Sequence, residues 1–445
     1  MNKKETLQVV ALFINGMVNF FLLNISNAYL VYVLGVSNFG DFSLTIKLIF
    51  YLAPFFSVGL TSLLAKHLPV FQDNNDTLNL NIFLKWNLKI LLRSLSIIGI
   101  LLVVIIIFRT TGLDNMPCLI FKNCESYRQT FGDLKFVLPI ALLLLWNSAL
   151  LSATKNILAS QLLGRSSITY SCALVIFIIN TFFASSQGLP VILSIFFGFL
   201  ALCLLQYIAI ILLLVIPKII TIRDIVKQSV TEEISKAYLK DGVSLLINSI
   251  IYVLQGLAPI LIIEWTCKDD TMLGDYFIVL FISSISTTLV RAFSKIIRPY
   301  YSNIHNEDRK SKLQKIINYQ LIFGGLWTIF VVFDFLILNS TILGFYGGSF
   351  VFSTFSVCFL MTYNYFSVVI FHAEKLCLFN NLNRFLYPTS IIQTTLMIIL
   401  CFLLIPHFFY LGAIFAIAIS QCLSAIACWI IIRIHRIDIK ILGII

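Results

Sequence analysis

The sequence predicts an all-α membrane protein of about twelve transmembrane helices in two pseudo-symmetric halves of six. Three observations carry this expectation: an apolar composition, apolar runs long enough to cross a bilayer, and a segment that returns after half of the chain. Of the 445 residues, 59% are hydrophobic, 11% are charged and 40 are phenylalanine, and the mean hydropathy is +0.97. This composition supplies too little polar surface for a soluble globular protein.

The predicted spans are apolar runs of about 20 residues, the length that crosses ~30 Å of hydrocarbon at 1.5 Å per residue. The first run has no small-residue cleavage site and is longer than the core of a signal peptide, so we expect it to remain as a span. Twelve runs are found, at 7–34, 40–66, 84–108, 136–161, 167–186, 190–216, 241–265, 272–299, 317–339, 350–374, 385–405 and 409–433.

The distribution of Lys and Arg predicts the orientation. With the amino terminus in the cytoplasm, 25 of the 31 basic residues lie on the inner side and five on the outer side. This bias satisfies the positive-inside rule, and an even number of spans places both termini in the cytoplasm. The net charge of +11 is therefore a topology signal, and we expect no nucleic-acid partner.

A repeated segment predicts two halves. In residues 34–69 and in residues 270–299 a short polar link ends in Gly-Asp-aromatic, at 40–42 and at 274–276, and an apolar run follows that closes on a basic residue and a proline. The glycines Gly40 and Gly274 are 234 residues apart, and the prolines Pro69 and Pro299 are 230 apart. Weak symmetry of this kind is typical of transporters. We therefore expect an N-terminal half at 1–216, a linker at 217–240 and a C-terminal half at 241–445.

Polar residues follow one face of the first span of each half. Asn15 and Asn19 are one turn apart, and Asn248, Tyr252 and Gln255 form the corresponding stripe in the seventh span. Such residues either form hydrogen bonds between helices or line a water-filled cavity, and the sequence leaves both interpretations open.

Two connections carry further expectations. The linker at 217–240 has apolar residues at helical spacing opposite a charged face, which predicts an amphipathic helix on the inner membrane surface, as a hinge, a strut or a passive link. The outer loop at 109–135 contains Cys118 and Cys124, and a disulfide between them is left open.

The sequence contains no motif that predicts catalysis. The phosphate-binding loop, the nucleophile elbow, H-E-x-x-H and C-x-x-C are all missing from it. The five histidines lie near predicted membrane edges, and the cysteines have no ligand spacing. We expect neither an enzyme, nor a metal site, nor a cofactor.

Ionisable residues within spans are the candidate functional residues, because each costs about 2.5–3.5 kcal/mol at the bilayer centre. Lys47 in the second span and Arg291 in the eighth are candidate cavity cations, and Arg93 and Lys155 approach from the inner side. Asp334, in the ninth span, is the candidate for ion coupling. The alternative for the basic residues is snorkelling of long side chains to the interface.

The repeated Gly-Asp-aromatic opening, Pro54 in the second span, the basic-then-proline close and the twelve spans resemble the Wzx-type polysaccharide flippases. These belong to the superfamily that also contains the multidrug-and-toxin exporters. The resemblance implies a central cavity between the halves, alternating access, and export of an undecaprenyl-diphosphate-linked oligosaccharide in a bacterial inner membrane for O-antigen or capsule synthesis. It also implies basic cavity residues that meet the diphosphate, and membrane lipids, a polysaccharide polymerase and chain-length proteins as partners.

Three other classes compete with this interpretation. A multidrug exporter of the same superfamily is expected to have acidic cavity residues for cationic drugs, whereas the charge within these spans is mainly basic. A polymerase-type membrane glycosyltransferase is expected to have a longer outer loop than 109–135 and does not explain the repeat. A structural subunit predicts no polar stripe. The sequence does not identify the sugar, or whether a proton or sodium gradient drives transport.

Overall fold

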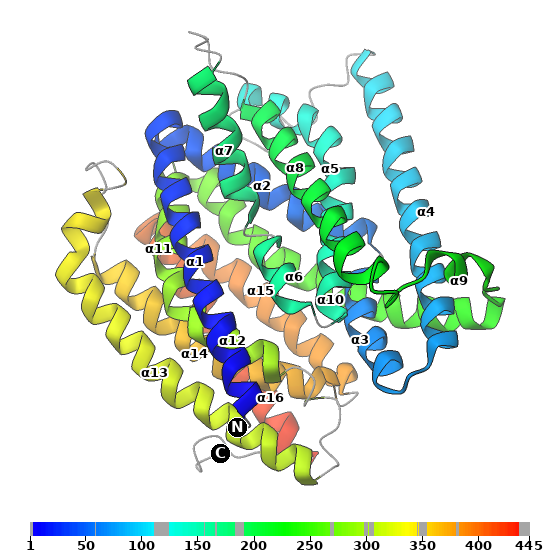
Figure 1. Cartoon of the computed structure of the whole chain (residues 1–445). Helices are drawn as coiled ribbons and strands as arrows, with labels where there is room; N and C mark the ends of the chain where they lie inside the picture. The colour runs from blue at the N-terminus through cyan, green and yellow to red at the C-terminus, as the bar shows by residue number, and fades with distance from the viewer. Residues whose placement is uncertain are drawn as a thin grey trace. The chain divides into compact units, whose positions relative to one another are not determined.

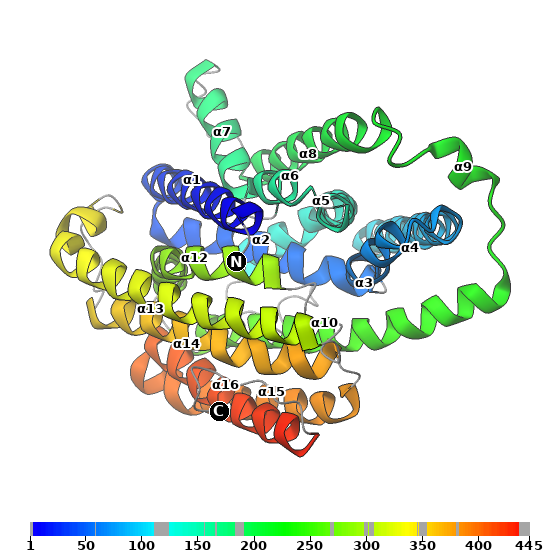
Figure 2. The same ribbon diagram turned by 60° about the horizontal axis from the view of Figure 1, so that its bottom comes forward.

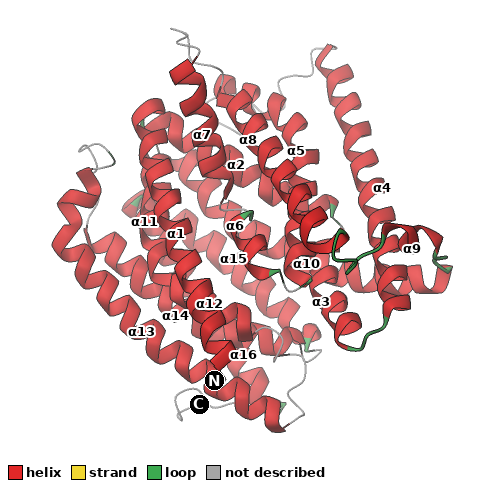
Figure 3. Ribbon diagram, in the orientation of Figure 1, coloured by secondary structure: helices red, strands yellow, loops and turns green. Residues whose placement is uncertain are grey.

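The computed structural model describes residues 3–57, 59–110, 124–154, 156–164, 167–182, 191–267, 271–297, 301, 307–344, 346, 354–379 and 382–435. Within these residues the regular secondary structure is helical, joined by turns and short loops (Figure 3). Nine of the described helical segments are long and apolar enough to cross a membrane. The predicted all-α membrane fold class is therefore confirmed.

Within the described residues, each of the twelve predicted runs corresponds to one helix or to consecutive helices. The second and eighth runs are each divided in the middle. The helices are α1 (Lys3–Leu34), α2 (Val36–Phe56), α3 (Leu60–Asp73), α4 (Thr77–Thr110), α5 (Cys124–Ala153), α6 (Ile157–Leu162), α7 (Ser167–Phe182), α8 (Val191–Ile210) with the π-helix η2 (Ile211–Val215), α9 (Ile222–Lys227), α10 (Glu232–Thr266), α11 (Met272–Ser283), the 3₁₀ turn η3 (Ser284–Thr287), α12 (Thr288–Ile297), α13 (Glu307–Gly344), α14 (Thr354–Phe379), α15 (Asn383–Phe408) and α16 (Tyr410–Ile434).

The chain packs as two compact units. Unit 1 comprises residues 1–41 and 258–445, and unit 2 comprises residues 42–257, so the chain passes from one unit to the other within α2 and within α10. These units describe packing, whereas the predicted boundaries at 216 and 241 describe a sequence repeat, and those boundaries stay a prediction.

In unit 1, α1 and the helices from α12 to α16 lie beside one another. α1 packs against α12, α12 against α13, and α13 against α14, while α16 contacts both α14 and α15 (Figures 1 and 2). Phe13 of α1 meets Trp327 of α13 edge-on, with ring centroids 5.2 Å apart. The Tyr346 hydroxyl donates to Asn24 Oδ1 of α1 at 2.7 Å.

Unit 2 is fixed at one end by an aromatic cluster. Trp86 of α4 and Tyr238 of α10 have ring centroids 5.3 Å apart, and Phe83 lies 5.1 Å from Tyr238. The Trp86 indole N–H donates to Ser235 Oγ at 3.1 Å, which gives the buried ring its hydrogen-bond partner. Before this cluster, Asp76 caps the start of α4 by accepting from Asn79, and those hydrogen bonds lower the pKa of Asp76.

The break between α2 and α3 is set by local sequence. Pro54 lies inside the last turns of α2, and Gly59 adopts a left-handed conformation with φ 72° before α3. A side chain is disfavoured there, and a Cβ on Gly59 would also lie 2.5 Å from the Gly242 carbonyl oxygen of α10. The glycine therefore serves both the turn and the close approach of two backbones.

The two glycines that open the repeated segments meet in unit 1. A Cβ on Gly40 of α2 would lie 2.9 Å from the Gly274 amide nitrogen of α11, and a Cβ on Gly274 would overlap the carbonyl oxygen of Val36. Only the missing side chains allow α2 and α11 to approach this closely. The repeat predicted from sequence thus corresponds to a crossing of its two copies at equivalent positions.

Candidate functional site

The predicted cations lie on different elements. Lys47 is on α2 in unit 2, where it is half-buried and has an interaction partner. Arg291 is on α12 in unit 1, and Arg93 is on α4 in unit 2. Lys155 lies outside the described residues. The common role of these side chains in one site stays a prediction.

Arg291 is an exposed cation on an otherwise buried part of α12. Its neighbours in sequence, Val290 and Ala292, are 1% and 2% exposed, whereas the arginine side chain is exposed. Among the described residues no acidic side chain pairs with it. An unpaired guanidinium in a membrane-length segment is suited to binding an anion such as a phosphate.

α13 holds the backbone around Arg291. Gln320, which is fully buried, donates from Nε2 to the Val290 carbonyl oxygen and to Ser294 Oγ, both at 2.9 Å. Because these bonds bracket Arg291 in sequence, the position and rotation of α12 are fixed where the arginine leaves the helix. Sequence analysis missed Gln320, although a glutamine inside an apolar span is itself a signal of a specific partner.

The helix break before α12 is also supported by side chains from other helices. Trp327 of α13 donates to the Ile285 carbonyl oxygen at 3.0 Å, and Asn364 of α14 donates to the Ser283 carbonyl oxygen at 3.2 Å. In hydrocarbon such carbonyls need a partner, because water is excluded. Two distant helices therefore stabilise the 3₁₀ turn that leads into the segment carrying Arg291.

The polar stripe differs between its two helices. On α1, Asn15 and Asn19 are buried, and Asn19 Nδ2 donates to the Asn15 carbonyl oxygen at 3.1 Å. On α10, Tyr252 is 45% exposed and Gln255 is half-buried with a partner, and the side chain of Asn248 is outside the described residues. The role of the stripe in lining a cavity stays a prediction.

Asn27 is a buried polar residue of α1 that sequence analysis missed. It is 0% exposed, and neither atom of its amide has a hydrogen-bond partner among the described residues. Asn15 Nδ2 is likewise without one. Because an unpaired buried amide is costly, these groups mark positions where water or another polar group is expected.

Asp334 lies on α13, ten residues before the helix ends at Gly344. Its side chain is exposed and forms no ion pair among the described residues. Its role in ion coupling stays a prediction.

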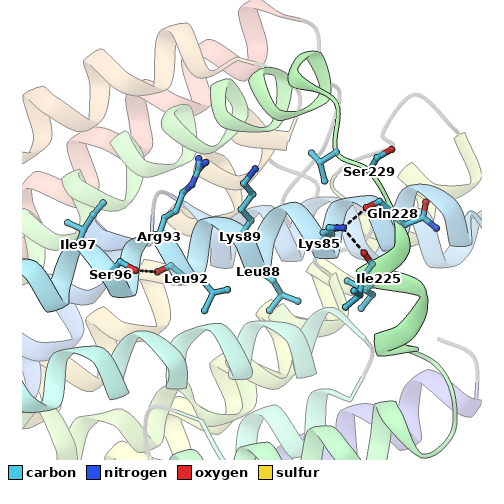
Figure 4. A pocket seen from close by; sticks show the side chains of 12 residues that line it. Lys85, Leu88, Lys89, Leu92, Arg93, Ser96, Ile97, Ile225, Gln228 and Ser229 are labelled. Atoms are coloured by element: carbon cyan, nitrogen blue, oxygen red, sulfur yellow. Dashed lines mark hydrogen bonds between the residues drawn. The ribbon is translucent and has the colours of Figure 1, made fainter.

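Arg93 lines a cavity of about 980 Å³ in unit 2. The cavity lies between α4 and the segment around α9 (Figure 4), and its residues are Lys85, Leu88, Lys89, Leu92, Arg93, Ser96, Ile97, Ile225, Val226, Gln228, Ser229 and Val230. We call it the α4/α9 pocket. Lys89 and Arg93 are both exposed and extend from the same side of α4.

The described residues contain no cluster of three or more His, Cys, Asp or Glu side chains that could hold a metal ion. Cys118 lies outside the described residues, as does the side chain of Cys124, so the disulfide between them stays open.

Comparison with known proteins gives a fold but no sequence family. No protein-family profile matches the sequence, and no protein of curated function matches it. Solved transporters match over nearly the whole chain. An inward-facing multidrug resistance MATE family transporter of the MOP superfamily has a TM-score of 0.65 at 14% identity, covering 96% of this chain and 98% of its own.

A second match is a MOP superfamily transporter from Pyrococcus furiosus, described by the reverse polarity of its binding pocket. It has a TM-score of 0.64 at 15% identity and covers 96% of this chain and 95% of its own. A MATE protein in complex with MaL6 gives 0.62 at 15% identity, with 98% coverage of both chains. At these identities the matches show the fold alone: the chain has the fold of the MOP superfamily transporters.

Proposed function

We propose that the protein is a flippase that moves an undecaprenyl-diphosphate-linked oligosaccharide across a bacterial inner membrane by alternating access. The substrate is made on the inner leaflet and used on the outer one for surface polysaccharide synthesis. In this proposal both termini are cytoplasmic, and a polymerase and chain-length proteins act on the exported unit. The fold supports transport, because the solved structures with this fold are transporters.

The observation that carries the choice of substrate is Arg291. A diphosphate and its sugars cannot enter hydrocarbon without losing their hydration. An exposed guanidinium without an acidic partner among the described residues, on a helix fixed by Gln320, replaces part of that hydration for an anion. The positive charge of the Arg291 guanidinium also repels a cationic drug.

A multidrug exporter is the second candidate, because the same fold is found in multidrug resistance transporters. Asp334 favours it, since an exposed acid within a long apolar helix attracts cations. The two candidates differ in the sign of the charge that transport requires.

The test is deletion of the gene in its source cell, followed by complementation. We expect deletion to abolish surface polysaccharide and to leave lipid-linked oligosaccharide on the inner leaflet. Wild type and Arg291→Lys should restore export, whereas Arg291→Ala should not. Likewise, Lys47→Arg should restore export, whereas Lys47→Ala should not. Arg433→Ala is the matched control, because Arg433 is an exposed arginine at the end of α16 in the same unit.

Unchanged polysaccharide with increased sensitivity to cationic drugs would overturn the flippase proposal in favour of the exporter. Full restoration by Arg291→Ala at wild-type protein level would remove the cationic path. The orientation is tested separately: a reporter active only outside the cytoplasm should give no signal after Ile445 and a signal within 114–130.

A further inference from the structure

We infer that the α4/α9 pocket binds the phosphate headgroup of an acidic glycerophospholipid of the inner leaflet. This inference does not rest on the transported molecule, because it concerns the packing of α4 against the linker; it shares with the proposed function only the predicted orientation, in which this end of α4 faces the cytoplasm.

One side of the pocket is formed by basic residues of α4, and the other is formed by the end of α9, which Lys85 holds in place. Lys85 points across to the linker, where its ammonium group donates to the carbonyl oxygens of Val226 at 2.6 Å and Gln228 at 2.5 Å (Figure 4). These two bonds hold the end of α9 against α4. Lys85 is therefore committed to the protein and is not available to a ligand.

Lys89 and Arg93 follow Lys85 at intervals of one turn and remain available. Both side chains are exposed, and neither has an acidic partner among the described residues. The twelve residues that line the pocket include no Asp or Glu. Two cations about 6 Å apart along the helix match the size of a phosphate group with its ester oxygens.

The remaining lining is apolar and exposed. Leu92 is 63% exposed, Ile97 53% and Val226 66%, and all three border the same cavity as the cations. A soluble anion would satisfy the charges and leave this apolar surface uncovered. A ligand with a phosphate and acyl chains satisfies both surfaces.

The cations can meet a lipid headgroup only by reaching toward the membrane surface. α4 enters the predicted span at residue 84, so the backbone of Lys89 lies about 8 Å and that of Arg93 about 14 Å into it along the helix, and long basic side chains at such depths extend to the interface. The basic residues of this segment belong to the expected inner side, where acidic lipids attract cations. A zwitterionic lipid carries its own cation and would leave Lys89 and Arg93 less well neutralised.

The consequence is a lipid that strengthens the contact between α4 and α9. The linker segment at 225–230 forms one wall of the pocket, and the cations on α4 form the other. A headgroup held by Lys89 and Arg93 and packed on Ile225 and Val226 adds to the two hydrogen bonds of Lys85. Acidic lipid should therefore stabilise the folded protein.

The experiment uses the full-length protein purified in detergent and reconstituted with defined lipid. Bound phosphatidylglycerol is counted by native mass spectrometry, and thermal stability is measured with phosphatidylglycerol, with phosphatidylcholine and with inorganic phosphate. The test variant is Lys89→Gln with Arg93→Gln. The control variant is Arg223→Gln with Lys227→Gln, which removes the same charge from exposed positions of α9 that do not line the pocket.

We expect phosphatidylglycerol to bind wild type and the control equally and to raise their melting temperatures. The test variant should bind it about tenfold more weakly or worse, because two charge-assisted contacts are lost. Equal binding by both variants would overturn the inference. So would equal stabilisation by phosphatidylcholine, and so would full stabilisation by inorganic phosphate alone, which would indicate a free-anion site.

Discussion

The two copies of the repeated segment have the same residue, a glycine, at the point where their helices cross. The first copy is α2 and α3, and the second is α11, η3 and α12. Gly40 and Gly274 occupy the same place in each and lie against one another in unit 1. Both copies are interrupted in the middle, the first after Pro54 and the second at η3. The shared features are those that fix the path of the chain.

The copies differ where side chains carry charge. With the 234-residue offset, Lys47 corresponds to Phe281, which packs against Phe39 with ring centroids 6.3 Å apart. Arg291 corresponds to Ser57, which is 2% exposed and donates to the Pro54 carbonyl oxygen at 2.8 Å. Each cation thus has an apolar or small, satisfied counterpart. The repeat explains the backbone, and the charges need a separate reason.

The largest expected effect comes from filling the glycine crossing. Gly274→Ala places a methyl group on the Val36 carbonyl oxygen, so α2 and α11 must separate. We expect a loss of about 3 kcal/mol of unfolding free energy, at the upper end for overpacking. Gly40→Ala should cost less, because its Cβ would lie 2.9 Å from the nearest atom. Denaturant unfolding in detergent measures both.

Gly99 of α4 provides the matched control for the crossing. A Cβ there meets no atom within 4 Å, so Gly99→Ala should be neutral or stabilise the helix by up to about 1 kcal/mol. Equal losses at Gly274, Gly40 and Gly99 would mean that the crossing does not constrain the fold.

The next prediction concerns substitutions that exchange the residues at equivalent positions of the two copies. Phe281→Lys removes aromatic packing against Phe39 and places an ammonium group among apolar rings, so we expect a loss of about 2 kcal/mol. Lys47→Phe should reduce stability less than Phe281→Lys does, because it keeps the volume of the side chain. It should reduce transport more, because it removes the charge. Measuring unfolding and export for both variants separates packing from charge. The same ratio of stability loss to transport loss in both would contradict the distinction between the copies.

The sequence predicted the helical membrane fold well, because apolar length is a local signal, whereas the division into two halves stays a prediction. It also identified Lys47 and Arg291 as asymmetric. It could not predict what supports Arg291, since Gln320, Trp327 and Asn364 come from helices separated from it in sequence. The linker was expected as one amphipathic helix over 217–240. The structure has a six-residue helix α9, a short non-helical stretch and then α10, and Lys85 of α4 donates to the carbonyl oxygens of Val226 and Gln228 at the end of α9.

A smaller effect tests the break in the second copy, which Trp327 and Asn364 support from other helices. Trp327→Phe removes the N–H that reaches the Ile285 carbonyl oxygen while keeping a ring beside Phe13. We expect a loss of about 1 kcal/mol, the value of one hydrogen bond. Trp265→Phe is the control, because Trp265 is 61% exposed and its contact with Phe402 is made by the ring. If the two variants melted at the same temperature, the break would not depend on this donor.

The smallest expected effect concerns the basic residue that closes the first copy. Lys66 Nζ lies 2.7 Å from Asp241 Oδ2, and the two side chains are 49% and 41% exposed. Water therefore screens the pair, and Lys66→Met should cost about 0.5 kcal/mol. Asp241 also lies 3.3 Å from His67 Nε2, so a double-mutant cycle of Lys66→Met with Asp241→Asn is needed to isolate the pair. The coupling should shrink further in high salt. A coupling above about 2 kcal/mol that salt leaves unchanged would show that the pair is shielded from water in solution. The closing basic residue would then belong with the glycine crossing, among the features that fix the chain, and not with the exposed charges.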